Sequence, residues 1–295
     1  RKDMDQALEC MKKAFELDSA YSRFLLEYDQ LRAKSGISAE ERLELLSAHL
    51  DLVTGRDALY VEYISLLNCT GQYDKALECL NGHLFHPWEG GEGKVSTQYR
   101  YALTQKALGL LESGGYDEAI NLLEATKVYP NNLGEGKLPN VQDNIADYYI
   151  GKSYQAKNDS AAASEYFEKA STGLEEPSGV LYYNDQPSDI ILYQGLANEE
   201  LGNTAAAKKC YHQLLAYGKK HIFDKVTYDY FAVSLPEIEV FPDNIKERND
   251  IYCRYLMALG HIGLGEKGEA DALLNKILQL KADYQGAIRH LPMAK

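Results

Sequence analysis

Two identical glycine-rich tetrapeptides are the most conspicuous residues that could perform chemistry. The sequence GEGK occupies residues 91–94 and again residues 134–137. A nucleotide-binding loop of this kind needs GxxxxGK followed by Ser or Thr. Trp88 and Asn131 stand where the first glycine of that pattern belongs, and an aliphatic residue follows each lysine, so we predict tight turns rather than a nucleotide site. The charged residues of the two turns remain candidates for contacting an anion or a polyol: Glu92, Lys94, Glu135 and Lys137.

Aromatic and polar residues near these turns and farther along the chain form a second set of candidates. The only tryptophan, Trp88, could stack on a ligand or fill a gap between elements, and a loop so rich in glycine favours the second role because it needs an anchor. His83, His86 and Glu89 follow one another at intervals of three, but Pro87 interrupts any helix there, so we predict no metal site. The candidate binding residues of this set are His86, Trp88, Glu89, Tyr182, Tyr183, Asn184 and Asp185.

The sequence carries no nucleophile elbow or other catalytic motif, so we predict no enzymatic activity and no cofactor. The chain has 295 residues, of which 45% are hydrophobic and 25% charged, as is typical of a folded globular protein. Its net charge of -13 repels phosphate backbones, which argues against nucleic acid as a partner. No stretch reaches the roughly 18 apolar residues that a membrane span needs. Five cysteines without a CxxC pattern favour a reducing compartment, such as the cytoplasm.

A repeated pattern of small and large residues indicates which elements position these groups. In five segments a turn residue is followed five places later by alanine and nine places later by a large apolar residue. Weaker copies around Ala7 and Glu41 extend the series, and the steps between equivalent positions are 34, 35, 43, 44, 44 and 63 residues. The first two steps match the period of the tetratricopeptide repeat, or TPR. The five alanines are Ala76, Ala119, Ala163, Ala207 and Ala270.

The segments before these turns have helical periodicity and carry glycines at a matching place. Gly151 and Gly195 each lie seven residues before a turn. Small residues at these positions let two antiparallel helices approach closely, while an aromatic or leucine fills the gap to the next repeat. We therefore predict an all-α fold, a right-handed superhelical TPR-type solenoid over residues 1–295 with about seven repeats. The first repeat is incomplete, so we expect more protein upstream.

The longer steps contain extra residues at equivalent joints of the solenoid. The surplus falls at 91–99, 134–143, 178–187 and, as a long insert, 222–250. Each lies between the second helix of one repeat and the first helix of the next. Since such joints lie along one edge of a solenoid, we expect a row of loops that forms a binding face. The inner groove, by contrast, lacks the basic cluster that clamps a peptide carboxylate, and its mixed surface suits a helix, a loop or a neighbouring domain.

Three stretches depart from ordinary repeats: HPWEGGEGKV (86–95), DYFAVSLPEIEVF (229–241) and NDIYCRYLMALGHIGLG (249–265). With them, the chain resembles a bacterial family of large proteins in which a β-rich region, similar to sugar mutarotases and of unassigned function, precedes TPRs. The resemblance implies that this chain is the C-terminal TPR portion. It also implies that an upstream β-rich or catalytic domain would carry any sugar chemistry, and it assigns no catalytic residue to the repeats.

Three hypotheses follow from these patterns. In the first, the chain is a non-catalytic interaction scaffold whose loop edge docks on the β-rich domain of its own chain or of a partner subunit. In the second, the loops complete a carbohydrate site, with Trp88, Tyr182 and Tyr183 stacking on sugar faces and lysines and Asp185 bonding hydroxyls. In the third, the chain is a conventional TPR protein that binds a peptide in its concave groove.

Overall fold

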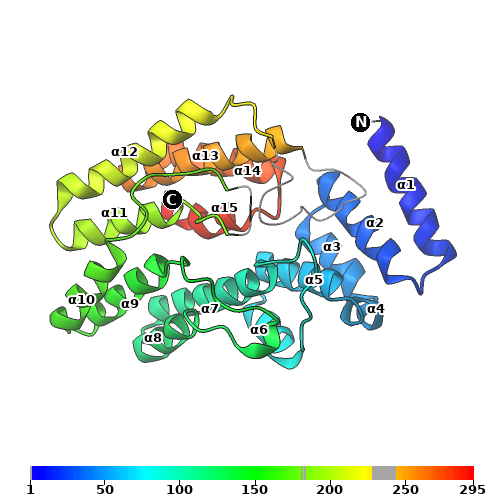
Figure 1. The fold of residues 1–295 in the computed structure, drawn as a ribbon, viewed down its shortest axis with the longest axis horizontal. Helices are drawn as coiled ribbons and strands as arrows, with labels where there is room; N and C mark the ends of the chain where they lie inside the picture. The colour runs from blue at the N-terminus through cyan, green and yellow to red at the C-terminus, as the bar shows by residue number, and fades with distance from the viewer. Residues whose placement is uncertain (1, 181, 183, 228–243) are drawn as a thin grey trace.

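The computed structural model describes residues 2–180, 182, 184–227 and 244–295, and every regular element in this part of the chain is helical (Figure 1). The first half of the chain contains helices α1 to α8 and one 3-10 turn. Their bounds are α1 (Lys2–Leu17), α2 (Ser22–Lys34), α3 (Ala39–Ser47), α4 (Leu50–Thr54), α5 (Asp57–Cys69), α6 (Tyr73–Gly82), α7 (Lys94–Ser113), α8 (Tyr116–Ala125) and the 3-10 turn η1 (Asn131–Leu133).

The second half continues the same pattern of paired helices and closes with a short helix. Its elements are α9 (Asn144–Ala156), α10 (Ser160–Ala170), α11 (Ile190–Glu200), α12 (Thr204–His221), α13 (Ile245–Gly263), α14 (Lys267–Leu280), α15 (Gln285–His290) and the 3-10 turn η2 (Leu291–Ala294). From α5 to α14 the helices form five successive antiparallel pairs, and each pair packs on the next. This confirms the predicted all-α, TPR-type solenoid.

Close packing within a pair depends on the small residues of the repeat. A methyl group on Gly195 of α11 would lie 2.3 Å from a ring carbon of Tyr211 on α12, and one on Gly151 would lie 2.6 Å from the ring of Phe167. The Tyr211 ring is approached just as closely by Gly263 of α13, in the next pair. One aromatic ring is therefore clamped between two repeats. The five repeat alanines are all buried.

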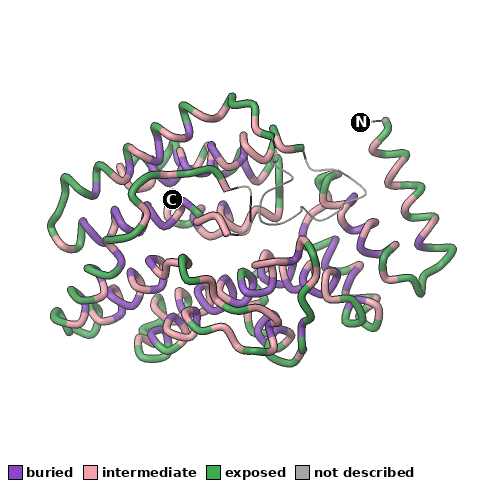
Figure 2. Tube along the Cα trace, viewed as in Figure 1, coloured by how far each residue is buried: buried purple, intermediate pink, exposed green. Residues whose placement is uncertain are grey.

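The buried hydrophobic residues form three clusters along the solenoid. In the Cα trace, the buried positions lie mainly on the sides of the helices that face other helices (Figure 2). The first cluster runs from Phe15 to Leu133, and the largest of the others runs from Tyr148 to Ala294. The superhelix turns back on itself, so that α15 lies between α13 on one side and α5 and α7 on the other (Figure 1). Residues of α3, α5 and α7 are thereby brought into contact with residues next to the C-terminus.

The structure corrects two of the predicted loops. Helix α7 begins at Lys94, so only the start of the 91–99 insert is a loop. Helix α13 begins at Ile245, so the last residues of the long insert 222–250 are helical. In both places the added residues lengthen the following helix, because a side-chain acceptor caps its first amides. The stretch YFAVSLP of the insert lies outside the described residues.

Candidate functional site

The two GEGK turns contact each other directly. The carboxylate of Glu135, in the second turn, accepts hydrogen bonds from the backbone amide of Gly93 in the first turn (2.6 Å) and from that of Ser96, which follows this turn in α7 (2.7 Å). These amides belong to the N-terminus of α7, where backbone N–H groups lack partners within the helix and the helix dipole favours a negative charge. One charged residue of the second turn therefore caps the helix that the first turn begins.

The two tetrapeptides share their letters but not their conformation. In the first copy, Gly93 has φ 76° and directly precedes α7. Gly91 of the same copy packs against the Trp88 indole, and a methyl group on Gly91 would lie only 2.1 Å from a ring carbon of Trp88. In the second copy the first glycine, Gly134, has φ 75° and approaches the carbonyl of Phe85 too closely for a side chain. Glycine is needed in both turns for local packing reasons. Neither turn presents the phosphate-binding arrangement.

The lysines and the tryptophan of these turns are engaged within the chain. Trp88 packs against the first core cluster, which supports the anchor role over ligand stacking, although its buried Nε1 meets no acceptor among the described residues. Lys137 forms an ion pair with Asp143. Lys94 interacts electrostatically with the carboxyl of Glu62, a half-buried residue. Desolvation raises the pKa of Glu62, and the positive charges of Arg42 and Lys94 partly oppose that rise.

The histidines near the first turn lie around a single carboxylate at the start of α5. Asp57 accepts a hydrogen bond from the His86 amide (2.7 Å) and contacts the ring of His83 at 2.6 Å. Burial alone would raise the pKa of Asp57, but these hydrogen bonds hold it below its usual range. Glu89 is exposed and does not join them. Within the described residues, no group of three or more His, Cys, Asp or Glu side chains is arranged to hold a metal ion.

The third loop, 178–187, forms hydrogen bonds with the second loop, 134–143. The carbonyl of Asn184 accepts a hydrogen bond from the Asn140 side chain, and the Asp185 carboxylate accepts one from the Tyr182 amide within the same loop. Tyr183 lies outside the described residues. The loop also contacts α13, where Arg248 donates to the carbonyl of Val180. Loops from three successive joints therefore contact one another in a row along one edge.

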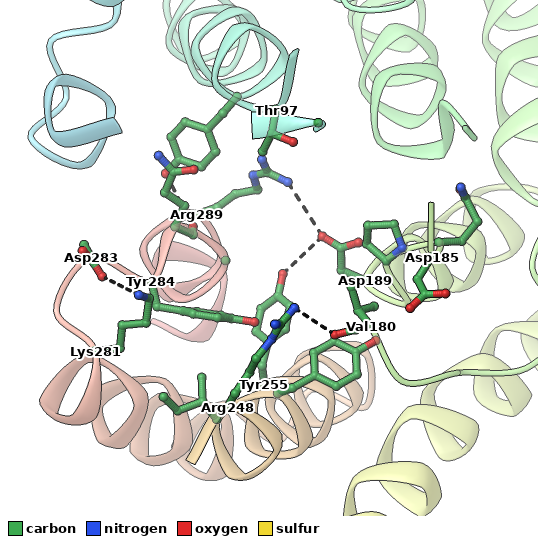
Figure 3. Close-up of a pocket in the computed structure, with 18 of the residues that line it drawn as sticks. Thr97, Val180, Asp185, Asp189, Arg248, Tyr255, Lys281, Asp283, Tyr284 and Arg289 are labelled. Carbon is green, nitrogen blue, oxygen red and sulfur yellow. Dashed lines mark hydrogen bonds and ion pairs between the residues drawn. The ribbon is translucent and has the colours of Figure 1, made fainter. Parts of the chain in front are cut away.

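This row of loops borders a cavity of about 1260 Å³ in the middle of the superhelix. Its wall includes residues of all three loops, the inner surface of α7, the start of α13 and residues 280–289 (Figure 3). Of the candidate residues from the sequence, Glu92, Glu135 and Asp185 line it. His86, Trp88, Glu89, Lys94, Lys137, Tyr182 and Asn184 do not.

A cation and a carboxylate face each other within the cavity. The guanidinium of Arg289 lies 3.9 Å from Asp189, whose carboxylate also accepts a hydrogen bond from the Tyr255 hydroxyl (Figure 3). Burial alone would lower the pKa of Arg289, but the surrounding oxygen groups raise it. Burial raises the pKa of Tyr255 well above its usual value, so its hydroxyl is a hydrogen-bond donor and not a base. The arrangement is suited to binding polar groups.

Behind this pair lies a fully buried histidine. His290 contacts the Tyr193 hydroxyl through Nε2 (2.9 Å) and the Gly286 carbonyl through Nδ1 (2.8 Å). Burial, with the nearby Arg289, lowers its pKa to about 3, so the ring is neutral. A neutral ring that donates from Nδ1 to Gly286 and accepts at Nε2 from Tyr193 satisfies both contacts. His290 therefore has a structural role that fixes α15.

Comparison with known proteins identifies the repeat. Residues 189–217 match the family model of the tetratricopeptide repeat, and these residues form α11 and most of α12. The chain folds as a TPR solenoid. Among solved structures it is similar to the TPR domain of P58(IPK), with 14% sequence identity and a TM-score of 0.32 over 99% of this chain and 83% of that one. The TPR fold suggests a protein-interaction scaffold. In the described part of the chain no helix has the length and hydrophobicity that crossing a membrane requires.

The inner face of the TPR solenoid holds a polar cluster that the sequence patterns did not reveal. Arg42 of α3, 2% exposed, forms a two-pronged contact with Asp29 of α2 and also donates to Asp283, just before α15, at 2.6 Å. Arg42 and Asp283 are 241 residues apart in the sequence. No local pattern identifies such a pair, because the curvature of the whole superhelix brings the two residues together.

Proposed function

We propose that this chain is a non-catalytic protein-interaction scaffold whose loop edge receives a segment of a partner domain. The observation that carries the proposal is the contact between the three loops, which join into one rim beside the cavity. Preformed loops of this kind present side chains without the cost of ordering them on binding. A partner segment that enters the cavity would meet a surface that is already in place.

The size and the charges of the cavity favour a polypeptide over a small molecule. Its volume of about 1260 Å³ exceeds the roughly 300–1000 Å³ typical of small-molecule pockets. The wall carries both signs of charge, with Arg100, Arg248 and Arg289 against Glu92, Asp185 and Asp189. Mixed charge is suited to a loop or a helix with both acidic and basic groups.

The partner that we favour is the β-rich domain that the family resemblance places upstream of the repeats. Such a domain would carry any sugar chemistry, and the TPR solenoid would hold or orient it. Docking can occur within one chain or between subunits. No catalytic role falls to the residues of this chain.

The experiment that tests this function measures association between this chain and the separately produced β-rich segment. Thr97 is exposed on the first turn of α7 and lines the cavity, so Thr97→Arg places a long charged side chain in the docking site (Figure 3). Thr204 is exposed on the first turn of α12 and does not line the cavity, which makes Thr204→Arg the matched control. Docking at the loop edge requires the first variant alone to weaken the complex.

A second function, carbohydrate binding, is favoured by one observation. The rings of Tyr252, Tyr255 and Tyr284 line the cavity together with Asp185 and Arg248, and aromatic faces beside polar groups are suited to sugars. The aromatic residues differ from those expected, since Trp88 packs into the core and Tyr182 does not line the cavity. Titration with a panel of neutral oligosaccharides tests this function. Binding that Tyr284→Ala abolishes while circular dichroism is unchanged would support it.

A further inference from the structure

The inner face of the first repeats is occupied by a segment from the other end of the chain. Asp283 binds Arg42, and the Gln285 side chain donates to Gln98 of α7 at 2.7 Å and contacts Ser65 of α5 at 3.4 Å. Arg289 lies over the ring of Tyr101 on α7, at 4.9 Å from its centroid. Residues 283–289 thus occupy the concave surface where TPR proteins commonly hold a peptide.

The two faces of α15 differ in chemistry and in what they contact. Ala287 and the following Leu291 and Ala294 pack into the core cluster that contains α13 and α14. None of these belongs to the core cluster of the first repeats. The face that meets α5 and α7 is polar and makes its contacts through Gln285 and Arg289, with Asp283 just ahead of the helix. Residues 283–289 and the turn after them therefore pack through apolar side chains on one arm of the solenoid, which contains α13 and α14. On the other arm, which contains α3, α5 and α7, they make polar contacts.

Polar contacts of this kind can be replaced by contacts with another molecule. Their carboxamide and carboxylate groups can form equivalent hydrogen bonds with water or with another polypeptide, so their net contribution to holding the arms together is modest. Arg42 also retains the two-pronged contact with Asp29 when Asp283 leaves, so separation does not strand an unpaired buried charge. An apolar contact of similar size would offer no such replacement partners.

We propose that the inner face of α3, α5 and α7 is a recognition site for a short polar helix, and that residues 283–289 are its resident occupant. The partner segment would carry a carboxylate for Arg42, a carboxamide two residues later for Gln98 and Ser65, and a guanidinium six residues after the carboxylate for the Tyr101 ring. A protein with this pattern displaces the resident segment and opens the two arms. The site shares part of its wall with the cavity beside the loop edge, but neither the contacts that support it nor its test depend on the docking function proposed above.

The test uses the full chain and a fluorescent synthetic peptide of residues 279–295 as the probe. The double variant Asp283→Asn with Gln285→Ala weakens the resident contact but keeps the apolar face of α15. The matched control is Glu269→Gln with Gln279→Ala, closely similar chemical changes at exposed positions of α14. A third variant adds Gln98→Ala to the first and removes one recognition group from the groove.

Fluorescence anisotropy gives the affinity of each chain for the peptide. We expect the double variant to bind the peptide at least about ten-fold more tightly than the unaltered chain and the control do, and the Gln98→Ala addition to reverse the gain. A peptide carrying the same Asp283→Asn and Gln285→Ala changes should not bind. Equal affinity in the double variant and the control would overturn the proposal. Loss of helical circular dichroism in the double variant would also overturn it, because residues 283–289 would then be a fixed part of the fold.

Discussion

At the residue scale, the repeat depends on contacts that leave no room for a side chain. Gly195 faces the Tyr211 ring at a distance that excludes even a methyl group. We predict that Gly195→Ala destabilises the fold by about 1–3 kcal/mol, as expected for an overpacked core. Gly109, toward the C-terminal end of α7, is the helical control, because a methyl group there would meet no heavy atom within 4 Å. Gly109→Ala should be neutral or stabilise by about 1 kcal/mol, since alanine favours helix.

Urea unfolding followed by circular dichroism measures both variants. Equal changes in the free energy of unfolding for Gly195→Ala and Gly109→Ala would show that the close approach to Tyr211 is not important for stability. The sequence spacing singled out Gly195, Gly151 and the repeat alanines because the same interval recurs in each repeat. It could not show that Tyr211 is clamped between two repeats, because Gly263 belongs to the next repeat and has no fixed spacing from it.

The buried His290 makes stability depend on pH. Its pKa is about 3 in the folded chain against an ordinary value of 6.5, so the unfolded chain binds the proton first as pH falls. Its contribution is therefore complete above pH 6.5 and is lost progressively as pH falls toward 3. The free energy of unfolding falls by at most about 1.4 kcal/mol per pH unit because of this group.

The variant His290→Asn isolates this contribution, because it keeps polar groups at the site but has no proton to gain. We expect the free energy of unfolding to fall less steeply in the variant than in the unaltered chain as pH is lowered from 6.5 toward 3. Urea denaturation at several pH values measures both slopes. Parallel slopes would mean that His290 is accessible to protons in the folded state.

At the element scale, the start of α7 depends on a residue in the next joint of the solenoid. Glu135 accepts hydrogen bonds from the Gly93 and Ser96 amides, and loss of such a cap typically costs about 0.5–2 kcal/mol. We predict a loss in that range for Glu135→Ala, with faster hydrogen exchange of the amides of residues 93–97. Glu89→Ala, at an exposed position, is the control. Unchanged exchange in the Glu135 variant would contradict the capping role.

The same contact explains why one predicted loop was wrong. Counting from the ordinary repeat length assigned 91–99 to a loop, but a carboxylate from the next joint stabilises a helix from Lys94 onward. The equivalent extension of α13 over residues 245–250 follows Asn244, whose side chain accepts from the Glu247 amide. Asn244 is a local signal that could have predicted this helix start. Glu135 is not, because its partner lies in another repeat.

At the scale of the whole molecule, the solenoid was predictable and its curvature was not. The recurring alanines and glycines determine how neighbouring helices pack, and the all-α fold class follows from them. The overall turn of the superhelix accumulates small rotations at each joint, and the enlarged joints have lengths that no standard repeat defines. For this reason the cavity and the contact between Arg42 and Asp283 could not be predicted from the sequence.

The most direct test of the scaffold is an isothermal titration of this chain with the separately produced β-rich domain that we propose as its partner. We predict a one-to-one complex whose dissociation constant rises at least about ten-fold in Thr97→Arg and stays unchanged in Thr204→Arg. Equal binding by the two variants would place the docking surface away from the loop edge. Absence of binding between two folded partners would contradict docking on that domain altogether.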